Sequence, residues 1–220
     1  MTDTALAQGA LALGLTLTVR QHAQLLAYAA LILKWNKVYN LTALRDPSAV
    51  LTHHLLDSLS VVLPLRRELV ARQGRAVAVP ERCRLLDVGA GAGLPGAVIA
   101  IVNDDIDVTC LDAVAKKTAF VQQVATELKL PNLRATHGRI ESVSADYDIV
   151  SSRAFASLKD FFEGSHNALA ADGIWLAMKG RVPTDELAQL PAGVEMFHVE
   201  QLDVPGLDAE RCIVWARHGN

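Results

Sequence analysis

The segment 84–102 constrains the fold more than any other part of the chain. It opens with a short apolar run, 84–88, of the kind that forms a buried strand, and it ends in an apolar stretch, 95–102, that predicts a helix. Three glycines stand at alternate positions between the two: Gly89, Gly91 and Gly93. Glycine is needed where the backbone turns with positive φ or where a ligand approaches the main chain closely. The segment therefore predicts a strand, a tight turn and a helix, with a candidate ligand site at the turn.

The residues after this unit continue to alternate between short apolar runs and helical patterns. The predicted elements are strands at 106–111, 133–136, 147–151 and 173–178, and helices at 116–130 and 157–170. Such alternation predicts a mostly parallel sheet with helices on both faces. Two further strands, 194–200 and 211–216, have no long helix between them and predict an antiparallel hairpin at the sheet edge. The expected fold class is α/β, with seven strands in one sheet.

The first 83 residues have a different pattern, which predicts helices. A capping box that begins at Thr18 opens an amphipathic helix of about four turns. Asp46, followed by a proline, marks the start of another helix. Residues 66–83 contain helix breakers and are interpreted as a connector. We therefore expect an N-terminal helical cap with an Arg-rich connector over 1–83 and a core over 84–220.

The distribution of charge is more informative than its sum. The formal net charge of -3 argues against a protein that coats nucleic acid through bulk positive charge. Between residues 66 and 84, however, the sequence holds a strip of arginines with only two glutamates among them. These arginines are Arg66, Arg67, Arg72, Arg75, Arg82 and Arg84. The strip is either a solvated connector or a surface that contacts nucleic-acid phosphates, and both interpretations stay open.

The cysteines and apolar segments indicate the cellular compartment of the protein. Its 3 cysteines, 51% hydrophobic residues and 20% charged residues predict a globular chain that folds without disulfide bonds. The cysteines lack a spacing that suits zinc, so no metal is expected. The apolar stretch 5–19 is too short to span a bilayer. We therefore expect a cytoplasmic monomer that does not contact membranes.

Two carboxylates near the glycines indicate what the turn binds. Asp112 closes the second core strand, where such folds place an acid that accepts the hydroxyl groups of a ribose. Asp87 ends the first strand, and its carboxylate either attracts an ammonium group or interacts with the dipole of the next helix. A cofactor with a cationic amino acid tail and no pyrophosphate, S-adenosylmethionine, suits this acid. The spacing of Gly91, Gly93 and Gly96 also matches the dinucleotide signature, so a nicotinamide cofactor is the alternative.

Five linked motifs carry a resemblance to a known family. In order they are Asn40-Leu41-Thr42, His54-Leu55-Leu56-Asp57-Ser58, the turn from Asp87 to Gly96, Ser152-Arg153-Ala154-Phe155-Ala156, and Lys179-Gly180. Over residues 25–216 the chain resembles the RsmG family, also called glucose-inhibited division protein B. The resemblance implies a Rossmann-like class I S-adenosylmethionine-dependent methyltransferase with a helical cap. It further implies a reaction at N7 of one guanine in the 530 loop of 16S ribosomal RNA, within the small subunit or an assembly intermediate.

The resemblance also implies which residues contact the cofactor. Gly89 and Leu94 on the turn, Ile140 and Glu141 after the third strand, and Arg153 after the fourth correspond to family contacts. Together with the acids and glycines of the turn, the predicted cofactor site consists of Asp87, Gly89, Gly91, Gly93, Leu94, Asp112, Ile140, Glu141 and Arg153. Ile140 and Glu141 follow a strand end, where such sheets bind ligands. An ordinary helix start with an exposed acid is the alternative.

Methyl transfer to guanine N7 requires positioning rather than a catalytic triad, because this nitrogen presents a free lone pair. Arg153 is expected to contact the cofactor carboxylate or the guanine O6, and Phe155 to stack on the base or pack in the core. Lys179 is expected to reach a phosphate or base, or to stand as a solvated strand end. His54 and Asp57 lie three residues apart on one helix face, so the carboxylate can orient the imidazole, although a structural pair is equally consistent.

The predicted RNA contacts come from the cap and from the Arg-rich strip. They are Arg45, Arg66, Arg67, Arg72 and Arg75. Three other functions compete with this interpretation: a nicotinamide-dependent oxidoreductase, a methyltransferase for small molecules or proteins, and an RNA-binding module without catalysis.

Overall fold

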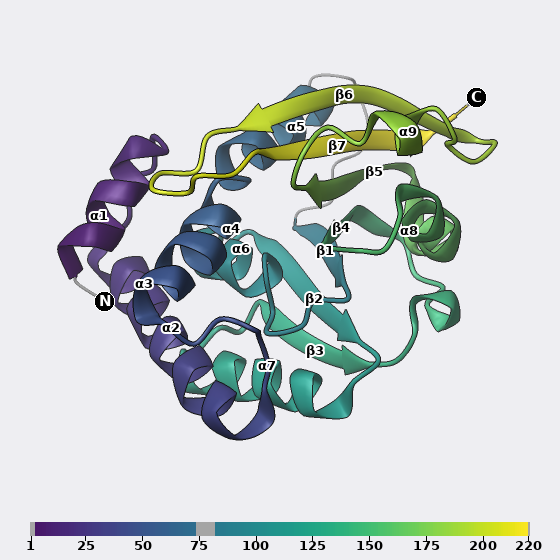
Figure 1. The fold of residues 1–220 in the computed structure, drawn as a ribbon. Helices are drawn as coiled ribbons and strands as arrows, with labels where there is room; N and C mark the ends of the chain where they lie inside the picture. The colour runs from purple at the N-terminus through teal and green to yellow at the C-terminus, as the bar shows by residue number, and fades with distance from the viewer. Residues whose placement is uncertain (1–2, 74–81, 220) are drawn as a thin grey trace.

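The computed structural model describes residues 3–73 and 82–219 as one sheet flanked by helices (Figure 1). The N-terminal helices are α1 (Asp3–Ala12), α2 (Val19–Tyr39), α3 (Pro47–Val50), η1 (Leu51–Leu56), α4 (Asp57–Leu59) and α5 (Val62–Gln73). The strands are β1 (Cys83–Val88), β2 (Ile106–Asp112), β3 (Leu133–His137), β4 (Tyr147–Arg153), β5 (Leu169–Lys179), β6 (Val194–Leu202) and β7 (Arg211–His218). The helices among them are α6 (Gly96–Val102), α7 (Ala115–Glu127), η2 (Ile140–Ser142), α8 (Leu158–Ser165), η3 (His166–Ala168) and α9 (Thr184–Leu187).

The strand order confirms the predicted mixed sheet. The order is β3-β2-β1-β4-β5-β7-β6, with parallel pairing from β3 to β5 and antiparallel pairing of β7 with both neighbours. The predicted hairpin is therefore present, with β6 as the edge strand. From β1 the chain adds β2 and then β3 on one side of β1, and it then crosses back to add β4 on the other side. The order of the strands therefore reverses between β1 and β4, which pair directly. Ligands bind at the carboxyl ends of parallel strands beside such a reversal, so the topology selects this edge as the site.

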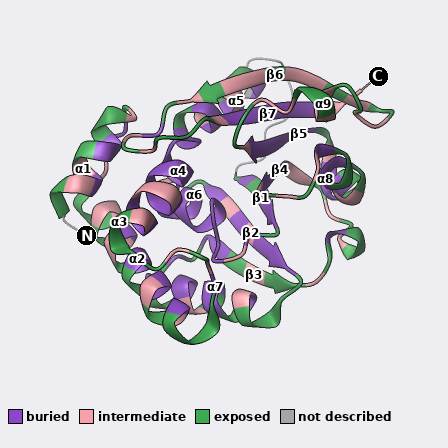
Figure 2. Cartoon of the chain, in the orientation of Figure 1, coloured by how far each residue is buried: buried purple, intermediate pink, exposed green. Residues whose placement is uncertain are grey.

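Successive residues of the central strands face two different apolar clusters. Leu85 of β1 packs in the cluster that includes α6, α7 and the N-terminal helices, whereas Leu86 packs in the cluster that includes α8. The helices α6 and α7 connect β1 to β2 and β2 to β3, on one side of β1, whereas α8 connects β4 to β5, on the other side. Right-handed crossovers in these two opposite directions place α6 and α7 on one face of the sheet and α8 on the other. Figure 2 shows the resulting burial of the central strands between the two helical layers.

The N-terminal helices begin at the predicted caps. Thr18 accepts a hydrogen bond from the N–H of Gln21, whose side chain bonds back to the Thr18 N–H, so the capping box is complete. Asp46 accepts hydrogen bonds from two backbone N–H groups of α3. With 21 residues, α2 is longer than the predicted four turns, because its buried face continues to Asn36. It ends at Asn40, whose φ of 49° is left-handed.

The predicted connector over 66–83 is wrong in its first part. α5 continues to Gln73 because Leu65 and Leu69 are buried in the core and hold this helix against it. Arginine is a good helix former, so an Arg-rich sequence is as compatible with an exposed helix face as with a connector. Residues 74–81, including Arg75, lie outside the described residues.

Within the described residues, one helical stretch, Pro47–Arg72, is long and apolar enough to cross a membrane. Its most apolar window is 72% buried inside the protein, as in a core helix. The buried leucines of this stretch belong to the same cluster as Leu85 of β1 and Phe120 of α7. The division of the chain at residue 83 stays a prediction, since the apolar core is continuous across it.

Candidate active site

The glycine turn, residues 89–93, lies at the carboxyl end of β1 beside the reversal of the sheet. Gly89, Gly91 and Gly93 have φ values of +66°, +60° and +85°, which L side chains rarely adopt. A Cβ on Gly89 would lie 3.9 Å from Phe155, and one on Gly91 would approach other atoms no closer than 4.0 Å. These two glycines therefore leave the main chain open toward a ligand, as a bound cofactor requires.

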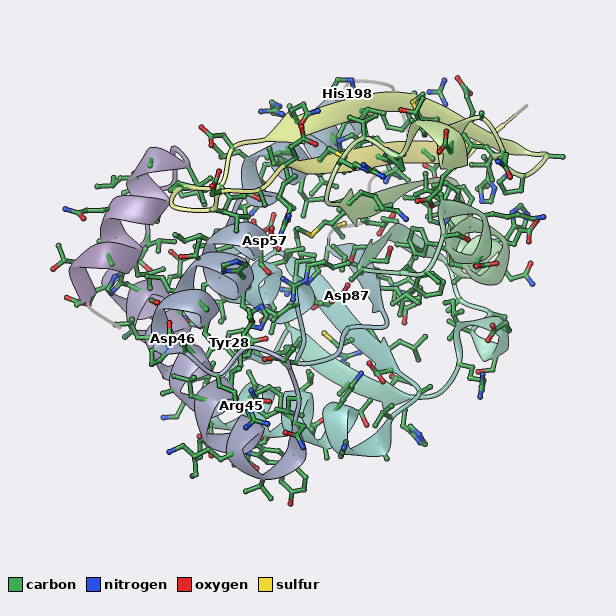
Figure 3. The ribbon with its side chains drawn as sticks, in the orientation of Figure 1. Tyr28, Arg45, Asp46, Asp57, Asp87 and His198 are labelled. Carbon is green, nitrogen blue, oxygen red and sulfur yellow. The ribbon has the colours of Figure 1, made fainter. Side chains whose placement is uncertain are left out.

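Asp87 supports the turn from inside the protein. Its side chain is fully buried and accepts hydrogen bonds from the N–H of Gly96 at 2.9 Å and the hydroxyl of Ser151 at 3.0 Å. Burial raises the pKa of Asp87 to about 6. The N–H of Gly96 belongs to the first residue of α6, so Asp87 makes the contact at a helix N-terminus that the alternative interpretation describes. The predicted attraction of an ammonium group, directly or through water, stays a prediction. Figure 3 labels Asp87 within the ribbon.

Asp112 holds the turn from the neighbouring strand. Its carboxylate accepts hydrogen bonds from the N–H groups of Gly91 and Val114, both at 2.9 Å, and the Lys117 Nζ lies 3.6 Å away. A carboxylate offers about four acceptor positions, so Asp112 can accept hydrogen bonds from ribose hydroxyls in addition to these. The ribose contact of Asp112 stays a prediction that the geometry permits.

Gly93 is the crowded glycine of the turn. A Cβ there would lie 3.1 Å from Val121 Cγ2 and 3.3 Å from Ala97 Cβ at a φ of +85°. We expect Gly93→Ala to lower the free energy of unfolding by about 2–4 kcal/mol, through left-handed strain and overpacking together. Gly193→Ala is the matched control, because its φ is +80° and a Cβ there meets nothing within 4 Å. Urea denaturation should show a loss of only about 1–2 kcal/mol for the control; equal losses would contradict the crowding.

Two further segments that carry predicted site residues follow the ends of β4 and β3. Phe155, in the loop after β4, is half-buried and packs with its ring centroid 5.6 Å from that of Phe161. The same ring is the nearest neighbour of the position that a Gly89 Cβ would take. Ile140 is buried at the start of η2, and the adjacent Glu141 is exposed. The predicted contacts of Ile140 and Glu141 with adenine stay predictions.

A cavity of about 400 Å³ lies at the carboxyl ends of β4 and β5. The ionisable side chains in its lining are Asp57, Arg153, Lys179 and Arg211, with His53 and His54. Asp57 is 2% exposed and pairs with two arginines: Arg153 Nη1 at 2.9 Å and Arg211 Nε at 2.8 Å. This ion triad joins the cap helix, the end of β4 and the start of β7. The expected contact of Arg153 with cofactor or base therefore has to coexist with its bond to Asp57.

A π-helical turn explains how Arg153 reaches the cap. In an α-helix the N–H of Asp57 would bond to the carbonyl of His53, but across η1 it bonds to the carbonyls of Thr52 and His54 instead. The carbonyl of His53 accepts a hydrogen bond from Arg153 Nη1 at 3.0 Å. Such turns are frequent at functional sites. Here the irregular turn provides the core arginine with an acceptor on the cap.

The predicted pairing of His54 with Asp57 is wrong. The Nδ1 of His54 lies 3.0 Å from the carbonyl of His53, and both carboxylate oxygens of Asp57 bond to arginines. The Nε2 of His54 is buried with no hydrogen-bond partner among the described residues. Because Asp57 bonds to the two arginines, its carboxylate does not orient this imidazole.

The environment of His54 predicts a pH-dependent stability. Burial, and then the nearby Arg153, lower the pKa of His54 to about 4. Protonation is therefore easier in the unfolded chain, so the stabilising contribution of His54 is present above about pH 6.5 and is lost as the pH falls toward 4. We expect the wild type to lose about 3 kcal/mol over this range relative to His54→Asn, as measured by urea denaturation at several pH values. A pH-independent difference between the two proteins would contradict this pKa.

The free energy of unfolding of the wild type has to be compared with that of His54→Asn, because the contribution of Asp87 depends on pH in the opposite direction. Its raised pKa of about 6 means that its contribution is present below about pH 4 and is lost as the pH rises through 6. The two contributions offset each other in the wild type over much of the same range. The difference between wild type and His54→Asn removes the Asp87 contribution, because Asp87 is present in both proteins.

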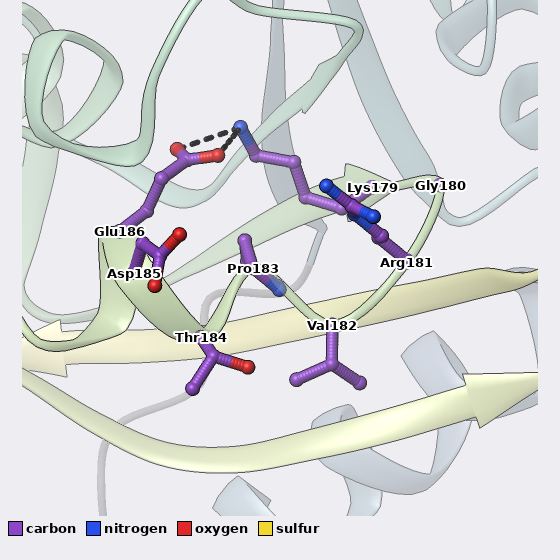
Figure 4. Close-up of a pocket in the computed structure, with 8 residues that line it drawn as sticks. All are labelled: Lys179, Gly180, Arg181, Val182, Pro183, Thr184, Asp185 and Glu186. Carbon is purple, nitrogen blue, oxygen red and sulfur yellow. Dashed lines mark hydrogen bonds and ion pairs between the residues drawn. The ribbon is translucent and has the colours of Figure 1, made fainter.

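Lys179 ends β5 as predicted but is not a solvated strand end. Its Nζ lies 3.0 Å and 2.9 Å from the two carboxylate oxygens of Glu186, which also accepts a hydrogen bond from the N–H of Leu158 at the start of α8. These contacts occur in a second cavity, of about 570 Å³, formed by residues 179–186 (Figure 4). A contact of Lys179 with phosphate or base would require it to exchange this partner.

The predicted RNA-contacting arginines have different environments. Arg72 is buried, donates to the carbonyl of Asp148 at 2.8 Å and lies 3.7 Å from Asp172, so a phosphate contact would require it to exchange these partners. Arg66 pairs with Asp105, and Arg67 pairs with Glu200. Arg45 is exposed, bonds to Asn40 at 3.0 Å and lies apart from Asp57 and Asp87 in Figure 3. Contacts of RNA with these three exposed or half-exposed arginines stay predictions.

Two residues of the site have no signal in the sequence pattern. Arg211 pairs with Asp57 across 154 residues, and Tyr28 of α2 donates a hydrogen bond to the glycine turn across 64 residues. Neither residue stands in a motif that sequence reasoning uses, because their roles depend on how the cap packs on the core. Within residues 3–73 and 82–219, no group of three or more side chains is arranged to hold a metal ion.

Comparison with known proteins identifies the family. The family described as GidB, rRNA small subunit methyltransferase G, matches residues 21–214. A protein of Acidovorax ebreus named ribosomal RNA small subunit methyltransferase G is 60% identical over 215 residues, or 98% of this chain and 95% of the relative. A protein of the same name from Polaromonas naphthalenivorans is 57% identical over 206 residues, or 94% and 91%.

The solved structures are more distant and bear on the fold alone. A SAM-dependent methyltransferase from Aquifex aeolicus superposes with a TM-score of 0.52 at 17% identity, over 78% of this chain and 97% of that one. A ribosomal protein L11 methylase from Lactobacillus delbrueckii subsp. bulgaricus gives a TM-score of 0.54 at 12% identity, over 80% of each. The fold class is thereby confirmed. The family match, together with this fold, supports S-adenosylmethionine as the cofactor. The chain belongs to the GidB family of rRNA small subunit methyltransferases G.

Proposed function

We propose that this protein transfers the methyl group of S-adenosylmethionine to N7 of a guanine in the 530 loop of 16S ribosomal RNA. The main support is the cavity at the carboxyl ends of β4 and β5, which lies next to the strand that carries the glycine turn and is rich in cations. Arg153, Arg211 and Lys179 in its lining face two carboxylates, that of Asp57 and that of Glu186, the partner of Lys179, so one positive charge remains in excess. This charge balance suits the phosphates of a nucleotide.

The residues around the turn fit the cofactor. S-adenosylmethionine supplies a methyl group on a positively charged sulfur. The open backbone at Gly89 and Gly91 would lie against it, Asp112 would accept its ribose hydroxyls, and Ile140 would flank its adenine. Tyr28 and Asp87 hold the shape of the turn from inside the protein.

The residues around the cavity would hold the target nucleotide. Phe155 follows the end of β4 by two residues, and its ring would lie 3.9 Å from a Cβ on the exposed Gly89, so it can stack on a base there. Arg153 offers nitrogens other than Nη1 for further hydrogen bonds, since its bonds to His53 and Asp57 among the described residues both come from Nη1. Methylation at N7 does not require a base, because this nitrogen carries no proton. The reaction therefore does not need the carboxylate of Asp57 as a base, and in the cavity this carboxylate is already bonded to two arginines.

The direct test uses tritiated S-adenosylmethionine with free 16S RNA, assembled small subunits, or mixtures of small molecules and proteins. We expect label in RNA, recovered as 7-methylguanine from the 530 loop. An RNA fragment with 7-deazaguanosine at the target position should accept no methyl group, because a carbon replaces N7, whereas the matched unmodified fragment should accept it. Label on the deaza fragment would overturn the N7 assignment.

The comparison of free RNA with assembled subunits identifies the true substrate, and label on small molecules or proteins alone would overturn an RNA substrate. Tight nicotinamide binding without S-adenosylhomocysteine binding would favour the oxidoreductase interpretation instead.

A further inference from the structure

We infer that Tyr28, on the helical cap, is a positioning residue of the cofactor site: its hydroxyl holds the glycine turn in the shape that binds S-adenosylmethionine. The Tyr28 hydroxyl donates to the carbonyl of Ala92 at 2.5 Å and lies 3.2 Å from the carbonyl of Gly93. Both carbonyls belong to the turn, and Tyr28 itself is fully buried. Figure 3 shows Tyr28 on α2, in the same central region as Asp87.

Three side chains form hydrogen bonds to the main chain of residues 91–96, and Tyr28 provides the one that does not come from the core. Asp112 accepts from the N–H of Gly91, and Asp87 accepts from the N–H of Gly96, the first residue of α6. These two core carboxylates bind N–H groups, whereas Tyr28 binds carbonyl groups between them. The segment with three left-handed glycines is thus fixed on both kinds of backbone group. Such fixing lowers the ordering cost of binding, because the free turn already has its bound shape.

Packing against neighbouring helices holds the Tyr28 ring in place. It packs with its centroid 6.4 Å from that of Phe120 on α7, and α2 contacts both α6 and α7. A Cβ on Gly93 would lie 3.4 Å from the Tyr28 hydroxyl, so the turn passes directly over it. Burial raises the pKa of Tyr28 well above its usual value, so the hydroxyl keeps its proton and remains a donor. The cap therefore contributes to the cofactor site as well as to the cavity.

The role of Tyr28 is distinguishable from plain packing. Without the hydroxyl, the buried carbonyl of Ala92 loses its partner, and the turn has to be reordered when the cofactor binds. A side chain that only supported the fold would change global stability and leave cofactor affinity unaltered. The hydrogen bond of Gln24 on the same helix offers that comparison, since its Nε2 donates to the carbonyl of Leu128, outside the turn, at 2.8 Å.

The test is calorimetric titration of Tyr28→Phe, Gln24→Met and the wild type with S-adenosylhomocysteine. We expect Tyr28→Phe to raise the Kd about 5- to 10-fold, the effect of one lost hydrogen bond, and Gln24→Met to leave it unchanged. Amide hydrogen exchange at Gly93 and Leu94 in the cofactor-free protein should accelerate in Tyr28→Phe beyond any change at amides of β5. In steady-state kinetics the KM for S-adenosylmethionine should rise while kcat at saturation is retained.

An unchanged Kd and unchanged exchange in Tyr28→Phe would overturn the inference, as would an equal rise in Kd for Gln24→Met. The inference depends on the cofactor and not on the RNA target. A wild type that binds S-adenosylhomocysteine but methylates no RNA would overturn the proposed function while leaving this test intact.

Discussion

Asp57→Asn is expected to lower the free energy of unfolding by about 3 kcal/mol, because it removes the charge that two arginines share. Asp57 is 2% exposed, and Arg153 and Arg211 both bond to it. Asparagine keeps the volume of the side chain but leaves two guanidinium groups together without a counter-ion. The side chains of Arg153 and Arg211 retain 20% and 23% exposure, so water screens part of the charge and the loss should lie at the low end for a broken buried pair.

Urea denaturation at neutral pH measures this loss, and Asp105→Asn provides the control. Asp105 also accepts hydrogen bonds from an arginine, Arg66, but its side chain is 59% exposed. An exposed pair of this kind contributes about 0–1 kcal/mol. A similar loss in both variants would show that the triad contributes no more than a surface ion pair.

The same substitution should reduce methyl transfer, because the triad fixes the position of Arg153. Positioning at a site of this kind contributes much of the rate, and a displacement of about 1 Å costs on the order of 10²-fold. Asp57 does not have to touch the substrate for this effect. Its role is to hold the arginine that lines the cavity.

The local patterns of the sequence predict the sheet well and the cap less well. The core strands and the helices between them have short, uninterrupted apolar runs, and most of their bounds are found to within three residues. The exception is the predicted helix 157–170, because α8 ends at Ser165 and β5 begins at Leu169, before the predicted strand 173–178. The Arg-rich helix α5 is missed because the arginines at 66, 67 and 72 interrupt the apolar pattern to which the buried Leu65 and Leu69 belong. The π-helical turn at 51–56 is missed because it depends on a tertiary contact with Arg153.

The location of the site is predictable, but the partners within it are not. The glycine turn and its two acids follow from spacing, because parallel strands bring their carboxyl ends to one edge. Which atoms those acids bind is set by burial: Asp87 is enclosed behind the turn, and Asp57 bonds to arginines 96 and 154 residues away instead of to the histidine three residues before it. Sequence spacing describes neighbours along a helix and cannot describe such distant pairs.

Arg153→Ala is expected to reduce kcat for methyl transfer by at least about 10²-fold while the Kd for S-adenosylhomocysteine changes by less than about threefold. Arg153 stands at the end of β4, lines the cavity and makes its bonds to the cap through Nη1 alone among the described residues. Its remaining nitrogens can therefore bond to the nucleotide without loss of the contact with Asp57.

Arg211→Ala separates this role from that of a counter-ion, since it removes the other guanidinium from the same carboxylate. If Arg153 acted only by neutralising Asp57, the two variants would lose equal stability and equal activity. We expect similar losses of stability, because each leaves Asp57 with one arginine. We expect a much larger loss of kcat for Arg153→Ala, because Arg153 ends β4 two residues before Phe155, whose ring would lie 3.9 Å from a Cβ on Gly89 of the turn. Full activity in Arg153→Ala, measured with S-adenosylmethionine and RNA at saturation, would exclude Arg153 from the reaction and leave the triad a purely structural link between cap and core.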